Sequence, residues 1–345
     1  MQYTHDIIII GQGLAGTVLS ETIADAGLRA MVFDAPLPER ASVVAAGIVN
    51  PVSLRRTVLS WRASEMLAIA GAFYRDLELE LESSIWHPMP MVELFPTAQE
   101  AGLWHARMKE KEYAHVLSTD ATDDPGIAQL PQPYGHGTIK RCAWLDVPKL
   151  LRVHRSRAMA NGSLEERKVE PSEVDVRDDG VEVHGRTAPF VVHCAGPFHQ
   201  LKGLVPVRGE GLTVKLPGLV LRSMVHRGVF MLPVGHELYR IGSTFVWDNV
   251  WSGPTDEGKR ALLDRLSRVW DGPVQVVDHW AGVRPAARDR RPILGSIGPR
   301  RFVFNGLGSR GALLAPWSAE HLVQHLFPGA PLDTEVNCAR FESEV

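Results

Sequence analysis

The sequence has 345 residues, of which 45% are hydrophobic and 22% are charged, and its formal net charge is −3. This composition is typical of a globular protein, the length favours two domains, and the charge gives no reason to expect a nucleic acid or an anionic membrane as partner. No apolar run reaches the roughly 18 residues of a membrane span, and three widely spaced cysteines argue against a disulfide framework, so we expect a cytoplasmic protein with no membrane contact.

The chain begins with a predicted strand, a glycine turn and a helix. Four isoleucines at 7–10 precede glycines at G-x-G-x-x-G spacing, and a second apolar run ends at Asp34. This pattern is the dinucleotide-binding fingerprint. Gly11 permits the tight turn, Gly13 lets a pyrophosphate approach, Gly16 lets the helix lie close to the strand, and Asp34 would bind ribose hydroxyls. The alternative is a glycine turn without a nucleotide.

Small residues and helical patterns follow in the first half of the chain. Residues 41–51 are small and apolar and end at Asn50-Pro51, which favours a loop near a ligand or, alternatively, a buried loop without one. Apolar residues at three- and four-residue steps predict a helix over 58–81. Prolines and short strand-like runs over 85–137, with a helix near 102–113, indicate an excursion into a second domain.

Strands dominate the second half of the chain. Asp146 is a predicted N-cap of a helix, and the apolar run 190–197 predicts a strand buried on both faces. Residues 204–294 alternate strands with turns, which indicates an antiparallel sheet, and apolar residues over 256–270 predict one helix there. Residues 302–311 form another strand leading into a G-x-G-x-x-G spacing before a helix over 312–327. Two helix N-termini facing one ligand suit FAD better than NAD.

Five motifs in this order give the sequence a family resemblance. Residues 7–34, 41–51, 192–197, 282–295 and 305–316 together resemble the D-amino-acid oxidase and glycine oxidase superfamily of FAD-dependent oxidoreductases. The last two are most similar to the FAD oxidoreductase domain of the bacterial enzymes that make 5-methylaminomethyl-2-thiouridine in tRNA.

The resemblance implies a noncovalent FAD and assigns residues to it. The expected cofactor-binding residues are Gly11, Gly13, Leu14, Ala15, Gly16, Asp34, Ser42, Ala46, Gly47, Ile48, Val169, Ala195, Gly196, Gly306, Leu307, Gly308, Ser309, Arg310 and Gly311. Arg284 matches the arginine that clamps a substrate carboxylate in the family. Arg310 would touch the flavin or the substrate or, alternatively, bond a loop carbonyl.

The resemblance also predicts the fold and the domains. We expect an α/β protein, α+β overall, with a Rossmann-like FAD-binding domain on a parallel sheet and a second substrate domain on an antiparallel sheet. The FAD-binding domain would comprise residues 1–84, 138–203 and 296–345, and the substrate-binding domain residues 85–137 and 204–295.

The implied reaction is oxidation of a C–N bond in an amino acid or secondary amine, with dioxygen as acceptor. A tRNA-modifying oxidoreductase and a nucleotide-binding protein without turnover are the alternatives. Tyr239, Trp247 and Trp251 would line the substrate pocket or pack in the core. His321 and His325 are interpreted as structural rather than metal ligands, so no metal site is predicted. The arginines at 288, 290, 291, 300 and 301 form either a solvated face or a tRNA-backbone contact.

Overall fold

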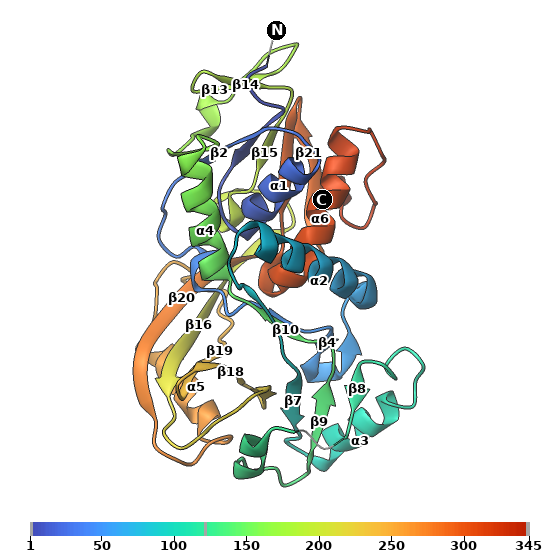
Figure 1. Ribbon diagram of the computed structural model, residues 1–345, viewed down its shortest axis with the longest axis vertical. Coiled ribbons are helices and arrows are strands. Elements are labelled where there is room, and N and C mark those ends of the chain that lie inside the picture. The colour runs from blue at the N-terminus through green and yellow to red at the C-terminus, as the bar shows by residue number, and fades with distance from the viewer. Residues whose placement is uncertain (1–2, 121–122, 343–345) are drawn as a thin grey trace.

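The computed structural model describes residues 3–120 and 123–342. Two main sheets organise the chain, a six-stranded sheet in the upper half of Figure 1 and an eight-stranded sheet in the lower half. This arrangement confirms the predicted fold class, in which a mainly parallel sheet is combined with an antiparallel one.

The six-stranded sheet has the order β11-β2-β1-β15-β22-β21. Its strands are β1 (Ile7–Ile10), β2 (Ala30–Asp34), β11 (Leu164–Glu166), β15 (Val191–His193), β21 (Ile293–Gly298) and β22 (Arg301–Asn305). All neighbours pair in parallel except β21, which lies antiparallel to β22.

Both faces of this sheet are covered, which explains the four consecutive isoleucines of β1. Ile7 and Ile9 pack with the helices, and Ile8 and Ile10 pack against a small antiparallel sheet on the opposite face. The helices are α1 (Leu14–Asp25), α2 (Ala63–Glu80), α4 (Val147–Ala160) and α6 (Gly311–Leu326). The small sheet is formed by β12 (Asp175–Val176), β13 (Val181–Val183) and β14 (Arg186–Ala188). Full burial of each isoleucine contributes about 2 kcal/mol to this packing.

The eight-stranded sheet has the order β20-β16-β19-β18-β17-β7-β9-β8. Its strands are β7 (Met91–Leu94), β8 (Leu117–Ser118), β9 (His136–Ile139), β16 (Leu204–Lys215), β17 (Met224–His226), β18 (Phe230–Gly235), β19 (Leu238–Gly242) and β20 (Gln275–Ala287). Only the β17–β7 pair is parallel. Helix α5 (Asp256–Leu266) packs on one face.

Shorter elements join the two sheets. A three-stranded sheet is built from β3 (Ile48–Val49), β6 (Trp86–Pro88) and β10 (Ala143–Leu145), and a hairpin from β4 (Val52–Ser53) and β5 (Val58–Leu59). Helix α3 (Ala98–Arg107) packs on β9 through Trp104, whose ring occupies the space where a Cβ of Gly137 would be.

Several predicted element boundaries shift by about a turn. The predicted N-cap Asp146 accepts a hydrogen bond from the Lys149 N–H at 3.1 Å, as expected. The helix expected at 102–113 instead runs over 98–107, because Thr97 caps it through the Glu100 N–H. The helices expected over 58–81 and 256–270 are shorter, over 63–80 and 256–266. The proposed domain boundaries stay a prediction.

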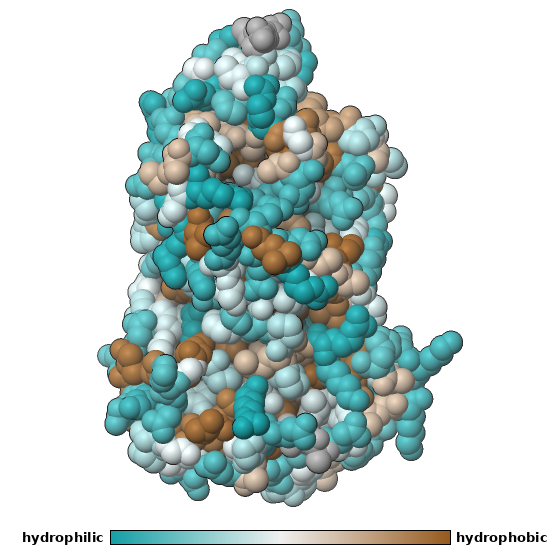
Figure 2. Space-filling model, viewed as in Figure 1, coloured by the Kyte–Doolittle hydropathy of each residue, from teal (hydrophilic) through white to brown (hydrophobic). Residues whose placement is uncertain are grey.

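The visible face in Figure 2 is mostly hydrophilic, with hydrophobic side chains in small separate patches. Among the described residues, no helix is long and apolar enough to cross a membrane.

Candidate active site

The first glycine turn leads from β1 into α1 as its sequence predicts. Gly11 has φ +104°, and a Cβ on Gly16 would overlap the Gly11 carbonyl oxygen, so the helix approaches the strand only because this side chain is absent. Gly13 precedes α1, and the Leu14 N–H donates to Ser42 Oγ at 3.1 Å. The first turn carries no acidic residue. Its N–H groups and positive dipole end are therefore suited to a phosphate.

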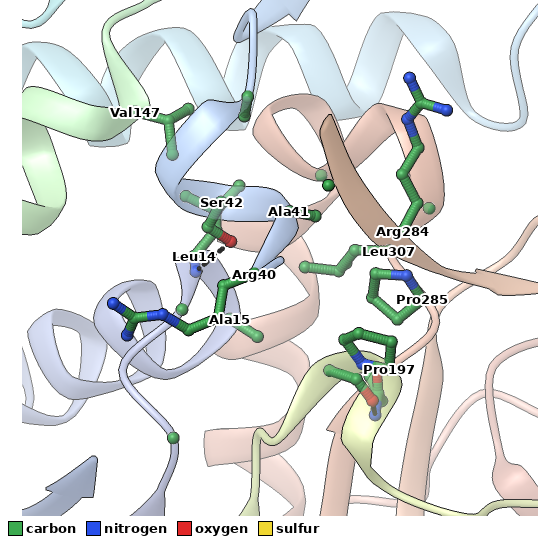
Figure 3. A pocket seen from close by; sticks show the side chains of 18 of the residues that line it. Leu14, Ala15, Arg40, Ala41, Ser42, Val147, Pro197, Arg284, Pro285 and Leu307 are labelled. Atoms are coloured by element: carbon green, nitrogen blue, oxygen red, sulfur yellow. Dashed lines mark hydrogen bonds between the residues drawn. The ribbon is translucent and has the colours of Figure 1, made fainter. Parts of the chain in front are cut away.

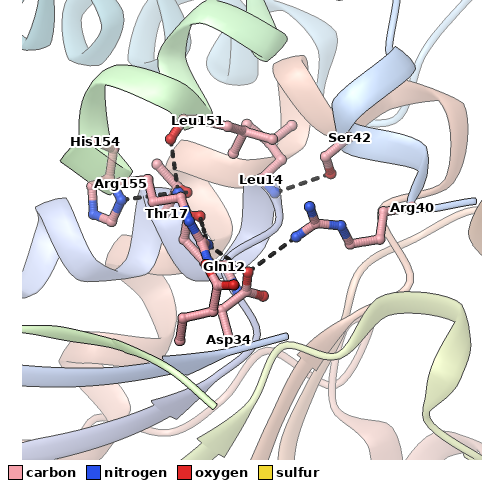
Figure 4. Close-up of polar contacts among 10 residues, drawn as sticks. Gln12, Leu14, Thr17, Asp34, Arg40, Ser42, Leu151, His154 and Arg155 are labelled. Carbon is pink, nitrogen blue, oxygen red and sulfur yellow. Dashed lines mark hydrogen bonds and ion pairs between the residues drawn. The ribbon is translucent and has the colours of Figure 1, made fainter. Parts of the chain in front are cut away.

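Asp34 contacts two arginine side chains as well as the backbone of the first glycine turn (Figure 4). Its carboxylate accepts from the Gln12 N–H at 2.8 Å, from Arg40 at 3.0 Å and from Arg155 at 2.7 Å, and the residue is only 4% exposed. Two arginines thus neutralise the acid that would bind the ribose. The sequence analysis anticipated neither of them, because α4 supplies one and the loop after β2 the other.

Gln12 connects the turn to α4. Its Nε2 donates to the Leu151 carbonyl at 3.0 Å and to His154 Nδ1 at 3.1 Å, and its Oε1 accepts from Arg155 at 3.0 Å. Burial, together with the neighbouring Arg157 and Arg155, lowers the pKa of His154 to about 4. His154 is therefore neutral and its Nδ1 can accept, as this contact requires.

The small-residue loop at 41–48 is fixed from the eight-stranded sheet. Arg240 of β19 donates to the carbonyls of Val44 at 2.6 Å and Ala45 at 2.8 Å. Its guanidinium lies 4.6 Å from the centre of the Trp280 ring. Gly47, with φ +70°, turns the chain immediately afterwards. Arg240 is a further residue that the sequence analysis missed.

The second glycine loop joins β22 to α6. Gly306 has φ +75°, and its Cβ would lie 2.6 Å from Ile293 Cγ1, so it serves the turn. Arg310 donates to the Asn50 carbonyl at 2.8 Å, which is the structural alternative considered for it. Burial and the nearby Arg290 lower the pKa of Arg310.

These segments enclose a cavity of about 660 Å³ between the two sheets (Figure 3). Every sequence-predicted site residue lines it except Gly16 and Gly306, whose role is to permit close backbone packing. Val169 follows β11, whose Glu166 pairs with Asp34, whereas Gly196 lies beside Pro285, the neighbour of Arg284, and all of these except Glu166 line the cavity. A long nucleotide cofactor fits this cradle, because glycine backbone and the N-terminus of α1, which has no acidic residue in its first turn, face the space that it would fill.

Arg284 of β20 extends its side chain over β16. Its guanidinium occupies the space that a Cβ of Gly209 would take, donating to Ser243 Oγ at 2.9 Å and the Thr244 carbonyl at 3.2 Å. The Phe245 ring lies beneath it at 4.6 Å. Burial lowers the pKa of Arg284 to about 10, so it stays charged at neutral pH. No carboxylate among the described residues pairs with it.

A row of glycines forms the floor of this end of the cavity. The Trp280 ring lies over Gly211 and the Phe230 ring over Gly242, each where a Cβ would otherwise be. Phe230 and His226 are opposite one another in the β17–β18 pair, and both line the cavity. Sequence reasoning missed these three side chains, since only the strand pairing brings them together.

The aromatic residues left open by the sequence are now located. Tyr239 belongs to the core, with its hydroxyl donating to the Leu219 carbonyl at 2.8 Å. Trp247 and Trp251 are 62% and 46% exposed and do not line the cavity. Trp251 stacks on Phe198, which does, with ring centroids 5.1 Å apart.

The two histidines of α6, and Arg300 and Arg301 of the arginine cluster, make contacts within the protein. His321 Nε2 accepts from the Asp333 N–H at 2.9 Å, and His325 Nδ1 lies 2.7 Å from the Ala330 carbonyl. Arg300 and Arg301 donate to main-chain carbonyls. Within residues 3–120 and 123–342, no group of three histidine, cysteine or acidic side chains could hold a metal ion.

Comparison with known proteins gives one family over most of the chain. Residues 6–325 match the family described as FAD dependent oxidoreductase. The bifunctional tRNA 5-methylaminomethyl-2-thiouridine biosynthesis protein MnmC of Marinobacter nauticus is 24% identical over 359 residues, covering 94% of this chain and 56% of that protein. Glycine oxidase of Pseudomonas aeruginosa is 23% identical, covering 94% of this chain and 96% of its own length. The chain thus spans little more than half of the MnmC relative.

Solved structures share the fold. Glycine oxidase from Geobacillus kaustophilus superposes with a TM-score of 0.80 at 22% identity, covering 99% of this chain and 98% of that one. Iminodiacetate oxidase from Chelativorans superposes with a TM-score of 0.76 at 21% identity, covering 97% of this chain and 98% of that one.

Proposed function

This chain belongs to the family of FAD-dependent oxidoreductases, and we propose that it oxidises the C–N bond of an amine that carries a carboxylate. The observation that supports this most is Arg284, a half-buried guanidinium at the cavity wall with only a hydroxyl and a carbonyl as polar partners among the described residues. A planar guanidinium binds a carboxylate through two parallel hydrogen bonds. A substrate carboxylate would supply the countercharge that the described residues do not.

The residues of the chain have distinct roles in this proposal. The first glycine turn and the N-terminus of α1 would hold the pyrophosphate of FAD, and Asp34 with its two arginines would lie at the ribose. When bound, FAD supplies the acceptor for a hydride from the carbon next to the amine nitrogen. Arg284 orients that carbon through the carboxylate, while Trp280 and Phe230 exclude water. The substrate also loses a proton, water hydrolyses the resulting imine, and we propose dioxygen as the final acceptor with hydrogen peroxide as product.

Anaerobic reduction of the flavin tests this function. We expect the purified protein to be yellow and noncovalently loaded, and its flavin bands to bleach when amino acids or N-substituted glycines are added. Peroxide should appear once air is admitted. Protein that binds FAD but is bleached by no member of such a panel would contradict the proposal.

An Arg284→Met variant tests the role of the guanidinium, with simple amines as the control substrates. We expect KM for carboxylate-bearing amines to rise at least 100-fold, because a charged, buried hydrogen-bonded pair is lost, while KM for simple amines should change little. Equal losses for both substrate classes would show that Arg284 supports only the fold.

A modified base in tRNA is a second candidate substrate. It is favoured by the aromatic rings of Phe198 and Phe245, which line the cavity and are 37% and 50% exposed, since aromatic side chains provide stacking surfaces for bases. Salt-dependent binding of tRNA and bleaching by undermodified tRNA would support this candidate. If neither occurs, tRNA is not the substrate.

A further inference from the structure

His226 is a second polar side chain that faces the cavity. It ends β17, lines the same cavity as Arg284 and lies opposite Phe230 in the sheet. Its Nδ1 is 2.7 Å from Glu93 Oε2 on β7, the next strand of the sheet. Nothing in the proposed oxidation has used this pair.

Glu93 fixes the orientation of the imidazole ring. The carboxylate is an acceptor, so Nδ1 carries a proton and Nε2 is the nitrogen left for a ligand. The Glu93 side chain is 11% exposed and that of His226 24%. A carboxylate behind a histidine fixes the tautomer and the ring orientation, as it does for histidines that bind a metal ion through the second nitrogen.

The surrounding charges favour the imidazolium form. Burial lowers the pKa of His226, but Glu93 and, more weakly, Glu100 of α3 outweigh burial, so the pKa is raised. The neighbouring Arg227 points elsewhere, donating to the carbonyls of Pro131 and Arg268. In its protonated form the ring has an Nε2–H donor and a positive charge, and both would favour an anionic ligand in the cavity.

The strand order sets how far His226 lies from Arg284. Arg284 lies over Gly209 of β16, and two strands, β19 and β18, separate β16 from β17. Neighbouring strands are about 4.8 Å apart, so the two backbones are roughly 14 Å apart. The Phe230 ring covers the floor between them. His226 therefore cannot contact the amine beside a carboxylate held by Arg284, but it can contact the far end of a longer substrate.

We propose that His226, held by Glu93, binds a second carboxylate at the distal end of the substrate. The substrate class is then an amino acid or secondary amine with two carboxylates separated by an apolar spacer that lies on Phe230. This inference rests on the proposed function, because it takes Arg284 as the anchor for the first carboxylate.

Binding of unreactive carboxylates to the FAD-loaded protein tests the inference without turnover. Dissociation constants would be measured from the perturbation of flavin absorbance by propionate and butyrate, and by succinate, glutarate and adipate. In the unchanged protein we expect at least one dicarboxylate to bind about tenfold more tightly than the monocarboxylates, the gain typical of one charged hydrogen bond. In His226→Ala this preference should disappear while monocarboxylate binding stays within about twofold.

Further variants distinguish the outcomes. Glu93→Gln keeps the shape of the pair but removes its charge, and should reduce the preference several-fold. Arg284→Met should weaken both kinds of acid, and the loss of monocarboxylate binding in it tests the proposed function separately. A dicarboxylate preference that depends on His226 would stand even if no amine bleached the flavin. Equal binding of both kinds of acid, or a preference that survives in His226→Ala, would overturn the inference.

Discussion

Gly209 leaves the space in which the Arg284 guanidinium lies. A Cβ at this position would overlap the guanidinium, although the glycine has an ordinary strand conformation. We therefore expect Gly209→Ala to displace the guanidinium without removing its charge. Overpacking of this kind costs about 1–3 kcal/mol, so KM for carboxylate-bearing substrates should rise roughly tenfold or more. Steady-state kinetics with the best substrate of the panel would measure the change.

Gly102→Ala is the matched control for that variant. Gly102 lies in the exposed part of α3, and a Cβ there would meet nothing within 4 Å. We expect it to stabilise the fold by about 0.5–1 kcal/mol, because alanine is the better helix former, and to leave KM unchanged. If the two variants had the same KM, the contact between Gly209 and Arg284 would be irrelevant to binding.

At the scale of residues, sequence spacing located the cofactor side of the site better than the substrate side. Gly11, Gly13 and Gly306 could be found because a turn that requires glycine leaves a local pattern. His226 could not, because its partner Glu93 is 133 residues away and only the pairing of β17 with β7 joins them. Asp34 was found, but its two arginines were not, since ion pairs between separate elements leave no periodic signal.

At the scale of elements, α4 supports the first glycine turn through a histidine that must stay neutral. The native pKa of His154 is about 4, below its ordinary value of 6.5, so the unfolded chain binds this proton first as the pH falls. Stability from this group is complete above pH 6.5 and is lost as the pH falls from 6.5 to about 4. The shift corresponds to roughly 3 kcal/mol. The Glu21 carboxylate lies 3.4 Å from His154 Nε2. Burial raises the pKa of Glu21, so this group changes the free energy of unfolding in the opposite direction as the pH falls.

Urea unfolding at a series of pH values would test this prediction. We expect the free energy of unfolding to fall less steeply between pH 6.5 and 4 in His154→Gln, which keeps a polar side chain that does not titrate. Flavin release should follow the same pH range in the unchanged protein, because Gln12 loses its acceptor when His154 is protonated. Parallel pH profiles for the two proteins would rule out His154 as the cause.

At the scale of the whole molecule, the cavity exists because the chain passes repeatedly between two sheets. The alternation of strand patterns allowed the two sheets to be expected from the sequence, and the fold class follows from it. The side chains that join them could not be expected. Arg240 lies on β19, yet it holds a loop that follows β2 in the other sheet, and its partners are main-chain carbonyls that no sequence pattern marks.

Arg240→Met would therefore test how far the eight-stranded sheet shapes the cofactor site. The change removes two charged hydrogen bonds to the loop at 44–45 and the contact with the Trp280 ring, while retaining most of the apolar stem. We expect the dissociation constant of FAD to rise at least tenfold, since charged hydrogen bonds contribute about 1.5–3 kcal/mol each and the loop carries Ser42, Ala46 and Gly47. Fluorescence titration of the apoprotein with FAD measures this constant. Arg268→Met, which removes an exposed arginine paired with Asp264, should leave it unchanged. Equal FAD affinity in both variants would mean that the six-stranded sheet and its own loops hold the cofactor without support from the second sheet.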